Sequence, residues 1–218
     1  MNNRNNIQIK ITPAFARLHA HICGDGSLFI TKERRLESEL RRHPRNDLVK
    51  RVYHMRYSNN SKRLLENVAK DLKTEFNKKA TWFHTKNQVG VRGKWFYDMF
   101  KSLGAGKSKE WFIPMQISSA PKKIKTEWLK AFFDDEAHVS RIKKKIVLNI
   151  VNKEGLKQIQ KLLSDLKIES TLGGPYKYKK YESYHLRIYR DYIKQYYGII
   201  GFNEPNKQKT LLELVGLI

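Results

Sequence analysis

Two apolar segments with helical spacing each end on an acidic residue and lead into a strand-like stretch. The first begins at Thr12-Pro13 and ends near Cys23, where Gly24 and Gly26 flank Asp25. A capping threonine, a proline in the first turn and a glycine after the last turn are typical helix boundaries. The second runs from Lys122 to Asp135 and is followed by Glu136. The pattern therefore predicts, twice in one chain, a helix that delivers a carboxylate to the start of a strand.

The remaining pattern repeats behind each of these helices. In the first half it predicts strands at 27–31 and 52–57, a helix at 62–76, strands at 80–84 and 88–92, and a helix at 95–103. In the second half it predicts strands at 138–143 and 145–151, a helix at 154–166, strands at 170–178 and 184–189, a helix at 192–199 and a terminal helix at 206–215. The charged stretch 32–51 is predicted to be a loop. The order αββαββα thus occurs twice, which predicts an α+β fold of two pseudo-symmetric halves.

Prolines at 114 and 121 bound a natural linker, which divides the chain into residues 1–108, a linker 109–121 and residues 122–218. Small residues recur along the two acidic helices: Ala16, Ala20 and Gly24 in the first, and Ala131 in the second. Helices with such a stripe can approach backbone to backbone. We therefore expect these helices to pair and to place their acidic ends side by side.

The charge of the chain points to a polyanionic partner. Lys and Arg number 44 against 21 Asp and Glu, which gives a net charge of +23 and a pI near 10.0. Neutralisation of phosphates would then supply affinity for DNA or RNA. A basic protein of the ribosomal type is the alternative.

Cysteine, histidine and hydropathy limit the remaining possibilities. The single cysteine, Cys23, excludes a disulfide framework and a cysteine-based zinc site. His19 and His21 are two residues apart on a helix, so we expect surface or partly packed positions rather than metal ligation. The polar start of the chain and the lack of an 18-residue apolar run indicate a cytoplasmic protein that neither spans nor binds a membrane.

At this point the chain resembles the LAGLIDADG homing endonucleases of the monomeric two-repeat type, in particular those encoded by archaeal introns in ribosomal RNA genes. The segment LHAHICGDG from Leu18 to Gly26 matches the first motif, and LKAFFDDEA from Leu129 to Ala137 matches the second. The resemblance covers nearly the whole chain, since each motif is followed by the ββαββα remainder. It implies two four-stranded antiparallel sheets that form a saddle over DNA, with the motif helices as the interface. The second motif departs from the pattern at Asp135, where Gly or Ala is usual, and at Ala137, where Gly is usual.

Paired carboxylates suit a magnesium-dependent hydrolysis of phosphodiesters. Such a reaction needs an activated water and relief of charge at phosphorus, which divalent ions supply. Mg²⁺, or Mn²⁺, prefers oxygen ligands and uses few protein carboxylates. Asp25 and Glu136 align in the two motifs and are the expected acids; Asp135 is the fallback, and Asp134 is expected to face the fold or a base. The resemblance also implies main-chain carbonyl ligands just before the acids, at Gly24 and Asp135.

Two basic residues are candidates for stabilising charge at the phosphates. The resemblance places Lys94 and Arg190, at the start of the third helix of each half, beside the scissile phosphates, where a cation would stabilise the transition state. A solvated charge flanking a helix is the alternative. Arg56 and Asn149 fall where this family often has a water-ordering Gln, and they rank below Lys94 and Arg190.

Recognition of DNA is expected from strand faces, because a two-stranded ribbon fits the major groove and alternate residues point at base edges. The candidates in the first half are Arg34, Arg35, Arg41, Arg42, Arg45, Arg51, Tyr53 and Arg56. The candidates in the second half are Arg141, Lys143, Lys145, Asn149, Lys177, Lys179, Tyr181 and Arg187. For any one of them an ordinary exposed charge is the alternative, and Tyr176, Tyr178, Tyr181 and Tyr184 suit sheet packing equally well.

The leading hypothesis is a site-specific double-strand DNA endonuclease for intron homing, which cuts across the minor groove and leaves short 3′ overhangs, as this family does. Its expected target is an intronless ribosomal RNA gene. One alternative is a splicing maturase that binds intron RNA on the same basic saddle. Another is a non-catalytic DNA-binding regulator, which normally loses the acids.

Overall fold

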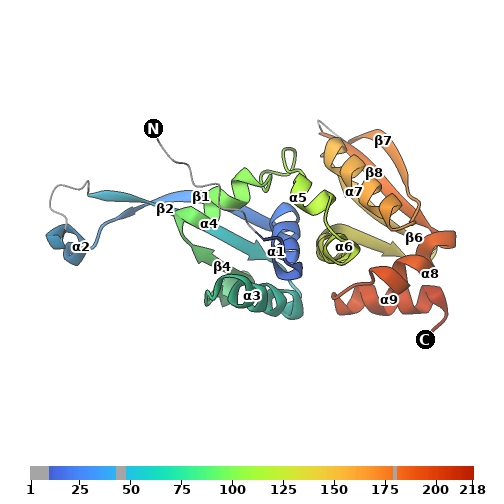
Figure 1. Cartoon of the computed structure of the whole chain (residues 1–218), viewed down its shortest axis with the longest axis horizontal. Coiled ribbons are helices and arrows are strands. Elements are labelled where there is room, and N and C mark those ends of the chain that lie inside the picture. Colours follow the sequence, from blue (N-terminus) through green and yellow to red (C-terminus); the bar gives the residue numbers. More distant parts are fainter. Residues whose placement is uncertain (1–9, 43–47, 179–180) are drawn as a thin grey trace.

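A computed structural model describes residues 10–42, 48–178 and 181–218 of the chain. Two similar halves lie on either side of a central pair of helices, α1 (Pro13–Cys23) and α6 (Lys122–Glu136), as Figure 1 shows. α1 begins with Pro13, and Pro121 directly precedes the first residue of α6. Thr12 caps α1 by accepting a hydrogen bond from the Phe15 N–H at 3.1 Å. The predicted order of elements, with one lead helix in each half, is confirmed.

The first half contains a four-stranded antiparallel sheet in the order β1-β2-β4-β3. Its strands are β1 (Gly26–Arg34), β2 (Val49–Ser58), β3 (Thr81–Phe83) and β4 (Gln88–Arg92), with a single 3-10 turn at His84–Lys86 between the last two. Its helices are α3 (Lys62–Phe76) and α4 (Lys94–Ser102). The paired register leaves alternate residues on the face that the helices cover, and these are the apolar ones.

The second half repeats this plan with the order β5-β6-β8-β7. Its strands are β5 (Ala137–Ser140), β6 (Lys145–Ile150), β7 (Thr171–Tyr178) and β8 (Tyr181–Tyr189). Its helices are α7 (Lys153–Asp165), α8 (Arg190–Ile199) and the terminal α9 (Pro205–Val215). The two predicted sheets and their antiparallel pairing are therefore present.

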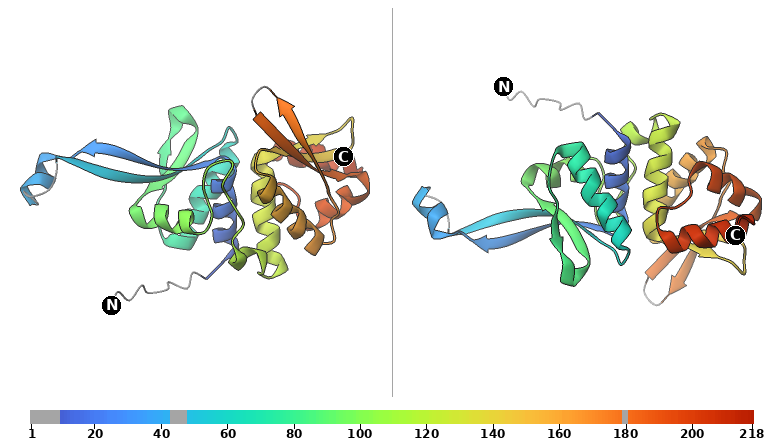
Figure 2. Two further views of the ribbon diagram at one scale, coloured as in Figure 1. Left: turned by 90° about the horizontal axis from the view of Figure 1, so that it is seen from above. Right: turned by 90° about the horizontal axis from the view of Figure 1, so that it is seen from below.

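The prediction of a loop over residues 32–51 was wrong. The first two strands are longer than expected and pair through three further positions, from Lys32 opposite Arg51 to Arg34 opposite Val49. Opposite charges face each other at Glu33 and Lys50, which stabilises a ribbon. A short helix, α2 (Glu37–Arg42), follows. This arm projects from the body in every view (Figures 1 and 2).

The linker is also more structured than its proline content indicates. Residues 115–118 form a short helix, α5 (Met115–Ser118), and Trp111 is only 3% exposed. The Trp111 ring packs against Phe132 of α6 with centroids 5.0 Å apart, and Phe132 stacks in turn on Trp128, also at 5.0 Å. The segment that joins the halves is thus part of the core around α6.

The seam between α1 and α6 is as tight as the small residues predict. Ala16, Ala20 and Ala131 are fully buried. A Cβ on Gly24 would lie 2.9 Å from the Cβ of Asp135, closer than carbon atoms approach without displacement. Backbone of α1 therefore touches α6 at the acidic end, where the two motifs meet.

His19 and His21 are buried, at 0% and 1% exposure, and the expectation of surface or partly packed positions was wrong. The reason is that α1 is enclosed by α6, α3 and the first sheet, so its polar side chains must find partners inside. The Nε1–H of Trp128 donates to His19 Nδ1 at 3.0 Å, and His19 Nε2 bonds the Leu103 carbonyl at 2.9 Å. Both histidines thereby hold the seam together.

An arginine fixes the other end of the seam. Arg17 of α1 forms two hydrogen bonds with the Asp71 carboxylate of α3, at 2.8 and 2.6 Å, and pairs with Glu127 of α6. The bond to Asp71 is the main cause that raises the Arg17 pKa. Three helices from the two halves are thus joined by one partly buried charge.

In the described parts of the chain, no helix combines the length and apolarity needed to cross a membrane.

Candidate functional site

Asp25 lies in the turn between α1 and β1. Gly24 ends the helix, with its N–H bonded to the Ala20 carbonyl at 2.9 Å, and β1 starts at Gly26 opposite Tyr57. The Asp25 carbonyl accepts from the Ser58 N–H at 3.3 Å, and its carboxylate accepts from Asn59 Nδ2 at 2.8 Å. The carboxylate is open to solvent but held in place from the β2 end.

Glu136 is the last residue of α6, directly before β5. Partial burial, followed by the charges of Asp25 and Asp135, raises the Glu136 pKa to about 7. The Asp25 pKa is raised to about 6, first by desolvation and then by the charge of Asp135. Because the charge of Asp25 acts on Glu136, the two predicted acids share one electrostatic environment at the end of the seam.

The side chain of the fallback acid, Asp135, is committed to the interior. It has no exposed surface, accepts from the Tyr57 hydroxyl at 2.6 Å and bonds His21 Nδ1 at 3.0 Å. Burial opposes protonation of His21, but the adjacent Asp135 carboxylate reverses the effect and raises the His21 pKa. Asp135, which departs from the usual second motif, therefore links α6 to the first half of the chain.

Asp134 faces the fold, which is one of its two expected positions. Its carboxylate accepts from the backbone N–H groups of Asn203 and Glu204, at 2.7 and 2.9 Å, and from Asn203 Nδ2 at 3.0 Å. Burial raises its pKa to about 6 despite these bonds. Asp134 thereby anchors the turn that precedes α9.

A lysine that the sequence analysis did not single out reaches the same helix end. Lys207 of α9 donates from Nζ to three consecutive carbonyls of α6, those of Phe133 at 3.3 Å, Asp134, and Asp135 at 3.1 Å. One of these is a carbonyl that the resemblance implies as a metal ligand. The chain has so many lysines that residue type alone gave no signal.

The oxygens present suit a hard divalent cation. Asp25 and Glu136 are carboxylates whose pKa values are raised partly by nearby negative charge, and a cation between them would relieve that repulsion. Within residues 10–42, 48–178 and 181–218 no group of three or more His, Cys, Asp or Glu is arranged to hold a metal. The two carboxylates are of the ligand type that Mg²⁺ and Mn²⁺ prefer, and other oxygens would complete a coordination shell.

The structure does not bring Lys94 or Arg190 to the acids. Lys94 pairs with Asp98 and lies over the Tyr53 ring, where the Gly93 N–H bonds the Tyr53 carbonyl. Tyr53 is four residues, or about 13 Å, along β2 from Tyr57, which faces the start of β1, so Lys94 lies beside a part of the strand away from the acid turn.

Arg190 follows Tyr189, the partner of Lys145 at the outer end of β6, and it lines a pocket with the end of α9. The helix starts of α4 and α8 thus lie beside parts of the strands that are away from the motif helices.

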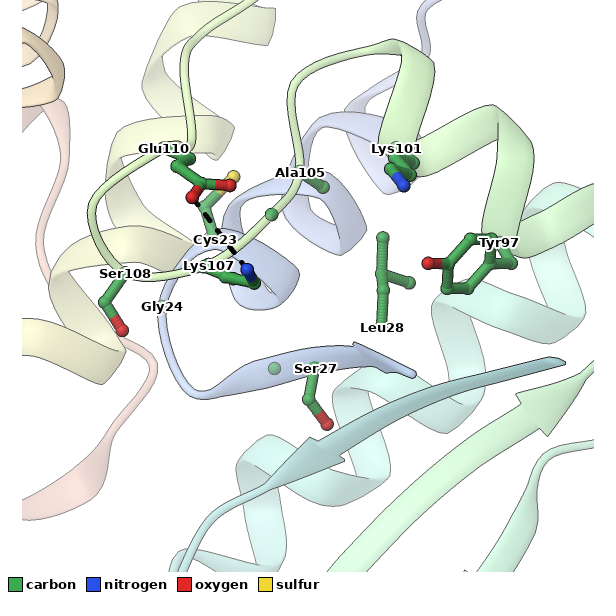
Figure 3. A pocket seen from close by; sticks show the side chains of 12 residues that line it. Cys23, Gly24, Ser27, Leu28, Tyr97, Lys101, Ala105, Lys107, Ser108 and Glu110 are labelled. Atoms are coloured by element: carbon green, nitrogen blue, oxygen red, sulfur yellow. Dashed lines mark ion pairs between the residues drawn. The ribbon is translucent and has the colours of Figure 1, made fainter. Parts of the chain in front are cut away.

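Other cations lie beside the acid turn. A pocket of about 390 Å³ adjoins Cys23 and Gly24 at the end of α1, and Figure 3 shows Lys101 and Tyr97 of α4 at its wall. Lys107, in the loop after α4, also lines it and pairs with Glu110 at 4.0 Å. Lys101 and Lys107 are therefore better placed than Lys94 to act near Gly24.

A second pocket, of about 520 Å³, lies on the other side of Asp25. It is lined by Asp25, Ser58, Asn59, Asn60, Ser61, Lys86, Asn87, Asp134, Asp135, Glu204, Asn206 and Lys207. Its walls come from both halves of the chain. The acid turn thus has a polar hollow on each flank.

The face of the first sheet away from the helices carries an arginine between aromatic rings. The Arg56 guanidinium lies 4.2 Å from the Phe83 ring centre and 5.0 Å from that of Phe29. His54 shares this face and stacks on Phe29 at 4.7 Å. Alternation along β2 places Arg51 and Tyr53 on the opposite face, with the buried Met55 and Tyr57. Two of the predicted DNA contacts in β2 are therefore not on the same side as Arg56.

The second sheet has a matching group. Arg187 bonds the Tyr176 hydroxyl at 2.9 Å and His185 Nδ1 at 2.8 Å, and the Tyr176 ring stacks on His185 at 4.3 Å. One row across the first sheet reads Ser27, Arg56, Gly90, and the corresponding row across the second sheet reads His138, Val147, Arg187. The two arginines thus occupy the same row of the two sheets, and Lys145 and Asn149 lie on the same face as Arg187.

The remaining predicted contacts are dispersed. In the arm, Arg34 ends β1, Arg35 follows it, and Arg41 of α2 pairs with Glu37 at 3.9 Å. In the second half, Arg141 pairs with Glu213 at 2.7 Å, and Lys143 lies in the turn before β6. Lys177 of β7 stands opposite Glu182 of β8. Arg45 and Lys179 lie outside the described residues, and the side chains of Arg42 and Tyr181 are not described. The pattern had not indicated Phe29, His54, Phe83 or His185, because aromatic and histidine side chains in strands are ordinarily read as packing.

Comparison with known proteins places this architecture in a class. Residues 123–201 match the family model described as the LAGLIDADG-like domain. The second half is thus similar to this family's domain, and the chain as a whole has the two-repeat LAGLIDADG fold, as the two motifs predict.

Among solved structures, the chain is similar to the homing endonuclease I-DmoI. Its complex with DNA and Ca has a TM-score of 0.64 and 19% identity, covering 93% of this chain and 98% of that one. Mesophilic variants of I-DmoI have a TM-score of 0.62 and 20% identity, covering 87% and 96%. Identity at this level shows the fold alone.

A curated relative is DNA-directed RNA polymerase subunit Rpo1N of Methanocaldococcus jannaschii, which is 28% identical over 222 residues. The match covers 90% of this chain but 16% of that protein. The chain thus spans about one sixth of the length of the relative.

Proposed function

We propose that this chain is a site-specific double-strand DNA endonuclease that uses Mg²⁺ or Mn²⁺ and cuts across the minor groove, leaving short 3′ overhangs. The observation that carries the proposal is the place of the two acids: Asp25 and Glu136 each directly follow one of two residues, Gly24 and Asp135, that touch across the α1–α6 seam, in a chain of net charge +23. Acidic side chains on a basic surface weaken the binding of DNA, so a catalytic role best explains why two of them are placed together.

Duplex DNA is the partner that the two sheet faces fit. Each face carries an arginine in the same row, Arg56 in one half and Arg187 in the other, together with a histidine and aromatic side chains. Arginine is the side chain that most often reads guanine in the major groove, and it also binds phosphate. Solved complexes of the structurally similar I-DmoI contain DNA with Mn or Ca.

The proposed interface on these faces consists of residues that share the side opposite the helices. In the first half they are Ser27, Phe29, Thr31, Glu33, Lys50, Val52, His54, Arg56, Gln88 and Arg92; in the second they are His138, Ser140, Lys145, Val147, Asn149, Thr171, His185, Arg187 and Tyr189. The arm with Arg34, Arg35 and Arg41 would extend the contact on one flank by about 10 Å, from the rise of its three paired positions between Lys32 and Arg34.

Within this scheme Asp25 and Glu136 hold the metal, with the Gly24 carbonyl as a further oxygen ligand. The bound ion would lower the pKa of a water and relieve charge at phosphorus. Asn59 fixes the orientation of the Asp25 carboxylate by its bond at 2.8 Å. Lys101 and Lys107, beside Gly24, replace Lys94 as the cations nearest the phosphates in the first half.

The experiment that tests this proposal is incubation of the chain with Mg²⁺ and a plasmid that carries an intronless archaeal ribosomal RNA gene. A discrete linear product is expected, which Asp25→Asn and Glu136→Gln abolish without loss of DNA binding. Asp165→Asn, which alters a surface pair with Lys125, serves as the control and should cut normally. Metal-dependent cutting that persists unchanged in Asp25→Asn contradicts the proposal, and binding to the intron RNA without any cutting indicates a maturase.

A further inference from the structure

The C-terminal helix α9 is attached to the acidic end of α6 by two contacts of opposite charge. Asp134 of α6 accepts from the backbone N–H groups of Asn203 and Glu204, just before α9 begins. Lys207, in the first turn of α9, donates to the last carbonyls of α6. The turn of α6 that carries Glu136 is therefore held by a segment almost seventy residues further along the chain.

The Lys207 ammonium sits where negative charge is concentrated. It caps the C-terminal end of a helix, which carries a partial negative charge. Its side chain also lines the same pocket as Asp25, Asp135 and Glu204. An ammonium has three donors and no acceptor, and here all three have a carbonyl partner.

We infer that Lys207 is a positioning residue for the acid site: a fixed cation that holds the end of α6 in register and offsets the charge of Asp25 and Glu136 before a metal arrives. This inference rests on the proposed function of those two acids. A cation built into the fold would keep the carboxylates close in the free protein. Because the Lys207 ammonium also bonds the Asp135 carbonyl, a divalent ion would bind instead to the two carboxylates and the Gly24 carbonyl.

The role predicts a specific response to divalent cations. When Lys207 is replaced by a neutral residue, the acids lose their fixed positive partner, so a divalent ion should bind more tightly. For charges of opposite sign within a few ångströms near a protein surface, a change of about tenfold in affinity is expected. A purely structural anchor would change stability without changing the affinity for the ion.

The test uses the full chain without DNA, with Ca²⁺ alone as the probe because it prefers oxygen ligands. Lys207→Gln keeps an amide donor for the carbonyls but removes the charge, and Lys207→Arg keeps the charge. Lys209→Met, on the same helix with an exposed side chain, is the control. Melting temperatures and Ca²⁺ titrations are measured for each variant.

The expected result is a melting temperature about 5 °C lower for Lys207→Gln, with Ca²⁺ binding about tenfold tighter than in the unaltered chain. Lys209→Met should match the unaltered chain in both, and Lys207→Arg should restore most of the stability. If Lys207→Gln does not fold but Lys207→Arg does, the fixed charge is supported. Equal Ca²⁺ affinity in Lys207→Gln and the unaltered chain, or no Ca²⁺ response in either, overturns the inference. Failure of Lys207→Arg together with Lys207→Gln also overturns it. Because no DNA is cut in these measurements, their outcome is separate from that of the cleavage test.

Discussion

Gly24 and Asp135 touch across the helix seam so closely that a methyl group on Gly24 would lie 2.8 Å from the Asp135 Oδ2 atom. The contact joins the residue before one proposed acid to the residue before the other. Asp135 cannot move away easily, since Tyr57 and His21 bond its carboxylate from the first half. The spacing of Asp25 and Glu136 is therefore set by a glycine.

Gly24→Ala should separate the two helices at their acidic ends. Overpacking a close contact costs about 1–3 kcal/mol, which corresponds to a fall of about 5 °C in melting temperature for a chain of this size. Gly106→Ala is the matched control, because a Cβ at Gly106 has no atom within 4 Å. A thermal melt of Gly24→Ala that coincides with that of the unaltered chain would show that the seam is looser than described.

Glu136→Gln should stabilise the fold at neutral pH. The Glu136 pKa is raised to about 7 by desolvation and by the charges of Asp25 and Asp135, so its ionisation destabilises the native state as the pH rises from 4.5 towards 7. Removal of that charge should add about 1–2 kcal/mol, after allowance for partial exposure, or about 3–6 °C. The exposed Glu110→Gln is the control. A lower melting temperature for Glu136→Gln would mean that Lys207 compensates the Glu136 charge fully, rather than in part, in the free protein.

His19 should make stability fall in mild acid. Burial lowers its pKa to about 4, against 6.5 in an unfolded chain, and the bond to the Leu103 carbonyl opposes this only in part. Between these values the unfolded state binds the extra proton, so the stability contributed by neutral His19 is complete above pH 6.5 and is lost as the pH falls towards 4. The difference is about 3 kcal/mol.

Replacement by glutamine tests this contribution. In His19→Gln the amide can still accept from Trp128 and donate to Leu103, but it does not titrate. Denaturant unfolding from pH 7.5 to pH 4 should show a smaller loss of stability in this variant than in the unaltered chain. The exposed His84→Gln should leave the profile unchanged. Identical pH profiles for His19→Gln and the unaltered chain would exclude the assignment.

Arg56 and Arg187 should dominate DNA binding on the two sheet faces. Each is held in place by aromatic or histidine side chains, so little side-chain entropy is lost when it contacts DNA. Arg56→Ala and Arg187→Ala should each weaken binding by about tenfold or more and lower the salt dependence by about one unit if phosphate is the partner. Arg63→Ala, exposed on α3 on the helix side, is the control. Equal affinity for all three variants would place the DNA elsewhere.

The repeat, the sheets and the helix seam were predictable because each depends on local pattern. Alternation in strands, caps such as Thr12 and small residues such as Ala20 act over one or two turns, and two motifs of one form imply a pairing. The arm was missed because its strands are rich in charge, and a two-stranded ribbon buries little that would show as periodic hydrophobicity.

The surroundings of the acids were less predictable. Lys207 reaches α6 from a separate helix, and Asp135 is satisfied by Tyr57 and His21 from the other half. Such contacts depend on how the halves dock, and no spacing within one segment encodes them. The expected position of Lys94 near the acids could not be judged for a related reason. Where Lys94 lies along β2 follows from the β2–β4 register rather than from its position at a helix start.

The most direct test of the central claim is a double-mutant cycle on the rate of DNA cleavage. If Asp25 and Glu136 act on one shared cation, Asp25→Asn and Glu136→Gln should each lower the rate by about 100-fold or more, and the double variant should be no slower than either single variant. Independent acids would instead give losses that multiply in the double variant, and that result would contradict the account.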